Sequence, residues 1–165
     1  TEHLIFLSHY KEEAGTEATL MQVGLQAAIA NHGNEWDVTG IFLDSENLTD
    51  LSGLQEHVVK SKNLVLLLTP GVLQRPWCLV EILTAKINEV QIVPVEIQRP
   101  GMTFVYPDEE FYSRLRKGGI LTKKDVKLLS VEGIAVEDVE DALRSVFTQI
   151  ALPFSPHKSK NVRDA

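Results

Sequence analysis

Cysteine is nearly missing from this sequence, which has one, Cys78, among 165 residues. A single thiol cannot form a bridge within the chain, and there is no CxxC pair to hold zinc. A domain of this length buries about 70% of the surface of its unfolded chain, so it can hold a core without such cross-links. These features indicate a domain of a reducing compartment, the cytoplasm, without a metal centre.

Long apolar runs and targeting signals are also absent. No stretch approaches the roughly 20 apolar residues of a membrane span, and no charged start followed by an apolar segment marks a signal peptide. The sequence begins with Thr1 rather than Met, which predicts a domain taken from a longer protein.

Basic residues are scarce in the first half of the chain. Residues 1–82 contain four Lys or Arg and eleven Asp or Glu, whereas residues 83–165 contain twelve of each sign, so the net charge of −7 belongs to the first half. A nucleic-acid-binding surface needs a basic face, so no nucleic-acid partner is expected. The six Lys or Arg of residues 114–127 could contact lipid or RNA, but a solvated helical surface is the favoured interpretation.

Apolar runs of strand length alternate with helical periodicity from end to end. The expected strands are residues 4–7, 38–43, 64–68, 91–97 and 131–134. The expected helices begin near residues 16, 49, 76, 108, 122 and 136. Pro94 lacks a ladder donor and predicts an edge, a bulge or an early end of its strand. Residues 1–152 are expected to form the domain, with 99–131 as an extended irregular and helical region and 153–165 as a flexible tail.

Alternating strands and helices predict an α/β fold with right-handed crossovers and a parallel sheet covered on both faces. With five strands, the flavodoxin-like order 2-1-3-4-5 is the leading topology. Ligands of such sheets bind beyond the carboxyl ends of the strands, at the switch between strands one and three. That rule selects residues 8–11, 44–47 and 69–77.

These strand ends exclude several familiar uses of the fold. Residues 8–14 contain neither GxGxxG nor GxxxxGK[ST], which argues against a Rossmann dinucleotide site and a P-loop. A receiver domain needs an Asp at the end of strand three, where this chain has Thr69-Pro70. The Ser/Thr-rich phosphate loop of a flavodoxin is absent as well.

Trp77 and Glu81 are four residues apart, so both lie on one face of the third helix. If this face turns toward the switch point, Glu81 can accept hydrogen bonds from a diol or stabilise a cationic transition state. The alternative is a solvent-facing Glu that offsets the helix dipole, and spacing alone favours it.

The ordered set of motifs resembles the TIR (Toll/interleukin-1 receptor) domains across residues 4–150. Ile5-Phe-Leu-Ser-His9 is similar to the first box of the family, and Phe42-Leu-Asp-Ser-Glu-Asn-Leu48 to the exit of its second strand. Leu66-Leu-Leu-Thr-Pro-Gly71, Trp77-Cys-Leu-Val-Glu81 and Ile92-Val-Pro-Val95 resemble its third strand, helix and fourth strand.

Among TIR domains the segments look most like those that cleave NAD+, including the axon-degeneration enzyme. The resemblance implies an NAD+ nucleosidase, without cofactor, that acts in immune or cell-death signalling and is activated by self-association with other TIR domains. It implies that Glu81 is catalytic. The substrate-binding residues that it implies are Ser8, His9, Tyr10, Lys11, Asp44, Glu46, Leu48 and Trp77.

Two other functions remain open: a non-catalytic TIR interaction module for signalling, and a hydrolase or transferase acting on free nucleosides.

Two side chains near the proposed site also have structural interpretations. Cys78 points about 100° away from Trp77 around the helix, which favours buried packing. His9 is either a pocket donor or a neutral histidine at a strand end.

Overall fold

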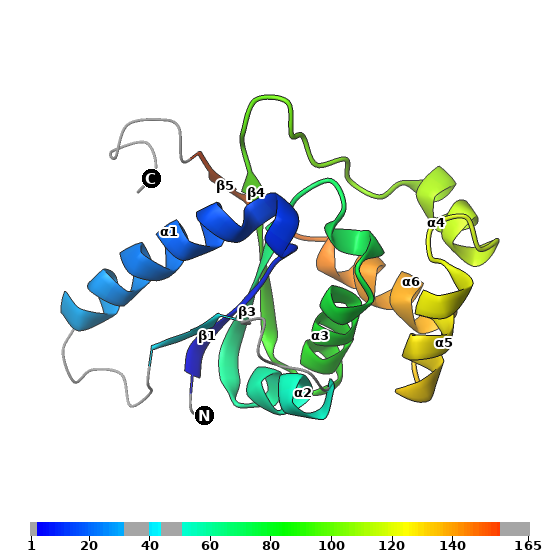
Figure 1. The fold of residues 1–165 in the computed structure, drawn as a ribbon, viewed down its shortest axis with the longest axis horizontal. Coiled ribbons are helices and arrows are strands. Elements are labelled where there is room, and N and C mark those ends of the chain that lie inside the picture. Colours follow the sequence, from blue (N-terminus) through cyan, green and yellow to red (C-terminus); the bar gives the residue numbers. More distant parts are fainter. Residues whose placement is uncertain (1–2, 32–39, 44–50, 156–165) are drawn as a thin grey trace.

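The computed structural model describes residues 3–31, 40–43 and 51–155, arranged as in Figure 1. The strands are β1 (His3–Ser8), β2 (Ile41–Leu43), β3 (Ser61–Leu68), β4 (Gln91–Ile97) and β5 (Leu152–Phe154). The helices are α1 (Lys11–Asn31), α2 (Leu51–Val59), the 3₁₀ turn η2 (Val72–Gln74), α3 (Pro76–Ile87), α4 (Glu109–Arg116), α5 (Lys123–Val131) and α6 (Val136–Val146).

The five strands form one sheet in the order β2-β1-β3-β4-β5, and every neighbouring pair is parallel. The α/β class and the flavodoxin-like order predicted from the sequence are therefore confirmed. Ser8, the last residue of β1, pairs with Leu66 in β3. Because β3 continues two residues further, the exits of β1 and β3 lie side by side at the carboxyl edge of the sheet.

The two faces of the sheet are covered unequally. Figure 1 shows α1 on one side, with α2, α3 and α6 on the other. Leu7 and Leu67 pack toward Ala14 and Ala18 of α1, in a small cluster. Phe6, Leu66 and Leu68 belong to the larger cluster, which the remaining helices complete. Successive residues of a strand point to opposite faces, so Ser8, which follows Leu7, points to the α3 side.

Local sequence signals locate several helix starts. Pro76 is the first residue of α3, as expected of a proline whose missing N–H has no partner in a first turn. Asp108 caps α4 by accepting a hydrogen bond from the Phe111 amide. Thr122 and Asp125 form the predicted capping box of α5. The first helix departs from expectation, since α1 begins at Lys11 rather than near residue 16.

The predicted last strand at residues 131–134 is wrong. Val131 ends α5 and is 77% exposed, and the chain then turns through Gly133, whose φ is +76°. The Ile134 amide bonds back to the Leu129 carbonyl, which closes the end of the helix. The fifth strand follows α6 instead and pairs with β4 from Val95↔Leu152 onward.

Pro153 and Phe154, which the sequence pattern assigns to the tail, lie in β5. The carbonyl of Phe154 accepts a hydrogen bond from the Gln98 amide, and Ser155 is buried. A proline is compatible with an edge strand because its missing N–H can face away from the partner strand. The sheet therefore extends past residue 152.

Pro94 is accommodated in an inner strand for a related reason. β5 pairs only with Val95–Ile97, so within the described residues the first half of β4 has a partner on the β3 side alone. Pro94 thus occupies a locally open edge, one of the three outcomes expected for it.

Candidate functional site

The site is centred on two buried polar side chains from distant parts of the sequence. Ser8 ends β1, and its hydroxyl donates a hydrogen bond of 3.2 Å to Oε1 of Glu81 on α3. Ser8 is 0% exposed and Glu81 is 1% exposed. The solvent-facing alternative for Glu81 is therefore excluded, and its carboxylate lies at the switch between β1 and β3.

Trp77 lies one helical turn before Glu81, on the same face of α3. Its indole is half-buried and packs against the larger core cluster. Cys78 points elsewhere: it is buried, and its thiol approaches the carbonyl oxygen of His9 at 3.6 Å. Trp77 can therefore present part of its ring to a ligand, while Cys78 packs as predicted and links α3 to the exit of β1.

His9 immediately follows the buried Ser8. Burial lowers the pKa of its imidazole, and the nearby charge of Lys11 lowers it further, against a raising effect from a backbone hydrogen bond at Leu7. Its Nδ1 is buried and has no hydrogen-bond partner among the described residues. These features favour a neutral ring at neutral pH, with one nitrogen available to a ligand or a water molecule.

Tyr10 and Lys11 lie where the chain leaves β1 and enters α1. The Tyr10 hydroxyl donates a 2.7 Å hydrogen bond to Glu12, which raises the pKa of the phenol. Lys11 is the exposed first residue of α1. The Arg75 guanidinium lies 4.7 Å from the centre of the Tyr10 ring. Arg75 is thus a second cation at this edge, which the sequence analysis missed although it lies in the selected segment 69–77.

Glu13 ties the loop after β3 to α1. The amide of Gly71 donates a 2.8 Å hydrogen bond to Oε1 of Glu13. A Cβ at Gly71 would lie 3.1 Å from Cε2 of Tyr10 and 3.2 Å from the same Glu13 oxygen. The close approach explains why glycine follows Thr69-Pro70, and no spacing signal in the sequence marks Glu13 as its partner.

Thr69 adds a further buried hydroxyl at the end of β3. It is 1% exposed, and its Oγ1 has no hydrogen-bond partner within the described part of the chain. Buried polar groups thus lie at the exits of both β1 and β3. Thr69 lies in the segment 69–77 that the strand-end rule selects, but it is not among the binding residues that the TIR resemblance implies.

The remaining predicted residues, Asp44, Glu46 and Leu48, lie outside the described residues, as do Thr49 and Asp50 at the expected start of the second helix. Within the described ranges, no group of three or more His, Cys, Asp or Glu side chains is placed to hold a metal ion. No helix in those ranges is long and apolar enough to cross a membrane.

No protein-family model matches the sequence, and no curated protein matches it. Among solved structures, the chain is similar to the TIR domains in the structure of the activated Roq1 resistosome directly recognizing the pathogen effector XopQ. That comparison covers 98% of this chain and 91% of the other, with a TM-score of 0.53 and 18% sequence identity. Together with the strand order, it shows that this chain has the fold of a TIR domain.

Proposed function

We propose that this domain is an NAD+ nucleosidase that cleaves the bond between nicotinamide and ribose. The observation that carries the proposal is the Ser8–Glu81 pair, a buried carboxylate at the switch point of the sheet. A charged side chain is costly to bury, so its presence at a ligand-binding position favours a functional role. The TIR fold is consistent with this activity.

The reaction needs a carboxylate more than it needs an acid. In NAD+ the nicotinamide ring is already cationic, so the C1′–N bond breaks with its electron pair leaving on a neutral nicotinamide. Positive charge develops on the ribose as an oxocarbenium ion, and Glu81 stabilises it while accepting hydrogen bonds from the ribose hydroxyls. A water molecule then adds to C1′ and loses a proton, which gives ADP-ribose. Attack by a group of the substrate itself gives a cyclic product.

The surrounding residues supply the rest of the binding site. The half-buried ring of Trp77 can stack on an aromatic part of the substrate. Lys11 and Arg75 provide positive charge for the pyrophosphate beside Tyr10. We keep Ser8 and His9 as further contacts, and Asp44, Glu46 and Leu48 as the loop that covers the substrate.

Burial of Glu81 also favours regulation of the activity. Because Glu81 is 1% exposed, its carboxylate cannot contact a ribose unless the side chains that cover it move. We therefore propose that the isolated domain is poorly active and that self-association with other TIR domains favours the open site. Such an enzyme suits cytoplasmic immune or cell-death signalling, in which NAD+ loss follows assembly.

The test is nicotinamide release from NAD+ by the purified domain, both dilute and concentrated with a crowding agent. We expect release that rises with protein concentration and falls at least about 100-fold in Glu81→Ala. Glu110→Gln, at an exposed position of α4, is the matched control and should retain full activity. Absence of release at every concentration contradicts the enzyme, and full activity of Glu81→Ala contradicts the site.

The second candidate is a non-catalytic interaction module. The same hydrogen bond supports it, because Glu81 can have a purely structural role and join β1 to α3 whether or not a substrate binds. This module predicts self-association without nicotinamide release, and a Glu81→Gln variant that still associates. The assay above therefore separates the two functions.

A further inference from the structure

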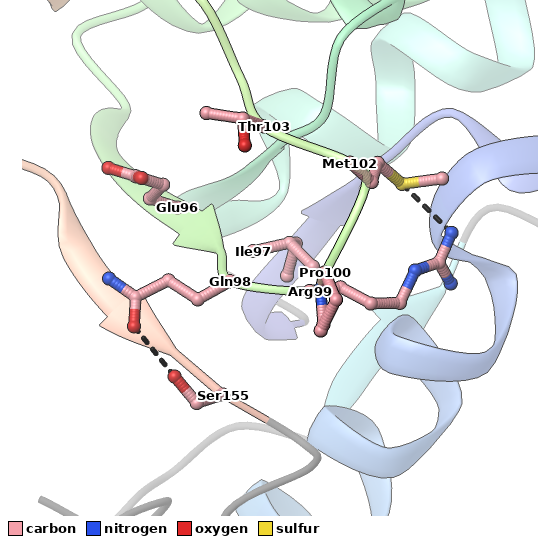
Figure 2. A pocket seen from close by; sticks show the side chains of 8 residues that line it. All are labelled: Glu96, Ile97, Gln98, Arg99, Pro100, Met102, Thr103 and Ser155. Atoms are coloured by element: carbon pink, nitrogen blue, oxygen red, sulfur yellow. Dashed lines mark hydrogen bonds between the residues drawn. The ribbon is translucent and has the colours of Figure 1, made fainter.

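A hollow lies at the carboxyl edge of the sheet, lined by residues other than the Ser8–Glu81 pair. It is a cavity of 350 Å³ formed where the chain leaves β4 and folds back on itself (Figure 2). Arg99 and Met102 close the turn with a backbone hydrogen bond of 3.1 Å, and Gly101 has a φ of +76°. Its volume falls in the lower part of the range of small-molecule sites, about 300 to 1,000 Å³.

The cavity wall is apolar on one side and polar on the other. Ile97, Pro100 and Met102 supply the apolar part. Figure 2 shows Gln98 joined to Ser155, whose hydroxyl donates a 2.7 Å hydrogen bond to the Gln98 side-chain oxygen and holds β5 against the cavity. The Gln98 amide group is thereby fixed at the rim.

Glu96 gives the cavity its charge. Its Oε2 accepts a 2.6 Å hydrogen bond from the Tyr106 hydroxyl. Burial and this hydrogen bond raise the pKa of Tyr106 to about 12, so the phenol remains a neutral donor. Among the described residues, no Lys, Arg or His forms an ion pair with Glu96. The carboxylate thus lines a small cavity, and no cationic side chain of residues 3–31, 40–43 and 51–155 is paired with it.

Arg99, the cationic side chain in the described wall of the cavity, already forms an ion pair with Glu17. Nη1 of Arg99 donates a 2.8 Å hydrogen bond to Oε1 of Glu17, which is 2% exposed, and Nη2 contacts the Met102 sulfur. The second oxygen of Glu17 is buried with no hydrogen-bond partner in the described residues. Arg99 is therefore already paired with Glu17, and Glu96 has no ion-pair partner among the described residues, which disfavours an anionic ligand at this cavity and favours a cationic one.

We propose that this cavity is a second binding site, for a small organic cation that consists of an ammonium or guanidinium group on a short apolar chain. The cationic head lies against Glu96 and donates hydrogen bonds to its carboxylate, while the apolar chain contacts Pro100 and Met102. Free amines and the side chains of Lys or Arg share this chemistry. The site does not depend on the proposed NAD+ cleavage, since Glu96 lies on β4 and Glu81 on α3.

The test is a titration of the isotope-labelled domain with N-butylguanidinium, followed by NMR chemical shifts at constant ionic strength. A ligand of about eight non-hydrogen atoms is expected to bind in the millimolar range. N-butylurea has the same shape without the charge and should bind at least about tenfold more weakly. Equal binding of the two compounds, or no shifts at residues 96–103, overturns the proposal.

Three variants locate the site. Glu96→Gln keeps an acceptor for Tyr106 and should weaken N-butylguanidinium at least about tenfold. Thr103→Trp fills the mouth from an exposed position and should abolish binding, whereas Glu110→Gln on α4 should leave it unchanged. Binding that survives both cavity variants contradicts the site. A terminally blocked glycine peptide with one central Arg distinguishes the two kinds of ligand. If it binds more tightly than N-butylguanidinium, the ligand is a side chain of another protein. If it binds more weakly, the ligand is a free amine.

Discussion

The hydroxyl of Ser8 and the carboxylate of Glu81 meet at 3.2 Å although 73 positions separate them in the sequence. Their contact joins the exit of β1 to the second turn of α3, and both side chains are excluded from solvent. A buried carboxylate needs donors to remain charged, and a strand-end hydroxyl is one. Fold and proposed chemistry therefore depend on the same hydrogen bond.

Ser8→Ala removes one donor from the buried carboxylate without changing the backbone. Hydrogen bonds to charged groups contribute about 1.5 to 3 kcal/mol, so we expect the free energy of unfolding to fall by about 2 kcal/mol. Urea denaturation measures the change. Ser130→Ala, at an exposed position of α5, is the matched control and should shift stability by less than about 0.5 kcal/mol. Equal effects of the two substitutions contradict a stabilising Ser8–Glu81 contact.

His9 should titrate below its ordinary value of 6.5, because burial and the charge of Lys11 lower the pKa of its imidazole. Between the folded-state pKa and 6.5 the unfolded chain binds more protons, so stability rises with pH across this window and falls as the pH drops through it. An NMR titration of the ring gives the midpoint. His9→Asn should flatten the pH dependence of urea unfolding in the same window. A midpoint at or above 6.5 contradicts this environment.

The parts of the fold that the sequence predicts well have local causes. Pro76 can begin a helix but not continue one, and Thr122 with Asp125 satisfies the first amides of α5 within four residues. β5 has no local cause. Its three residues form a strand because the end of β4 offers an open edge from Val95 onward, and that edge is created by tertiary structure.

In the candidate site, too, the sequence predicts the features with local causes and misses those that depend on tertiary packing. The spacing of Trp77 and Glu81 places both on one helix face, but it cannot say whether that face is buried, and alone it favoured the wrong alternative. Burial of Glu81 follows from the packing of α3 on β1 and β3. Arg75 and Glu13 were missed because their contacts, with Tyr10 and Gly71, join segments about 60 residues apart.

Gly71 and Gly24 should respond oppositely to alanine. A Cβ at Gly71 would lie 3.1 Å from the Tyr10 ring and press on Glu13, whereas a Cβ at Gly24 meets nothing within 4 Å. We expect Gly71→Ala to destabilise the domain by about 1 kcal/mol. Gly24→Ala, within α1, should stabilise it by about 0.5 to 1 kcal/mol because alanine loses less backbone entropy in a helix. Urea unfolding of the pair tests the close approach, and a stabilising Gly71→Ala contradicts it.

Arg99→Ala should be among the most damaging changes outside the core, because it leaves the carboxylate of Glu17 buried and uncompensated. Breaking such a pair costs about 3 to 5 kcal/mol, and we expect a loss near the lower limit of about 3 kcal/mol because the Arg99 side chain is 30% exposed. Arg114→Ala, an exposed arginine of α4, is the control and should have little effect.

The double variant Glu17→Leu with Arg99→Ala removes the buried, unpaired carboxylate, so it should be more stable than Arg99→Ala alone. If the double variant is instead less stable than Arg99→Ala, the burial of an unpaired Glu17 carboxylate is not what makes Arg99 necessary.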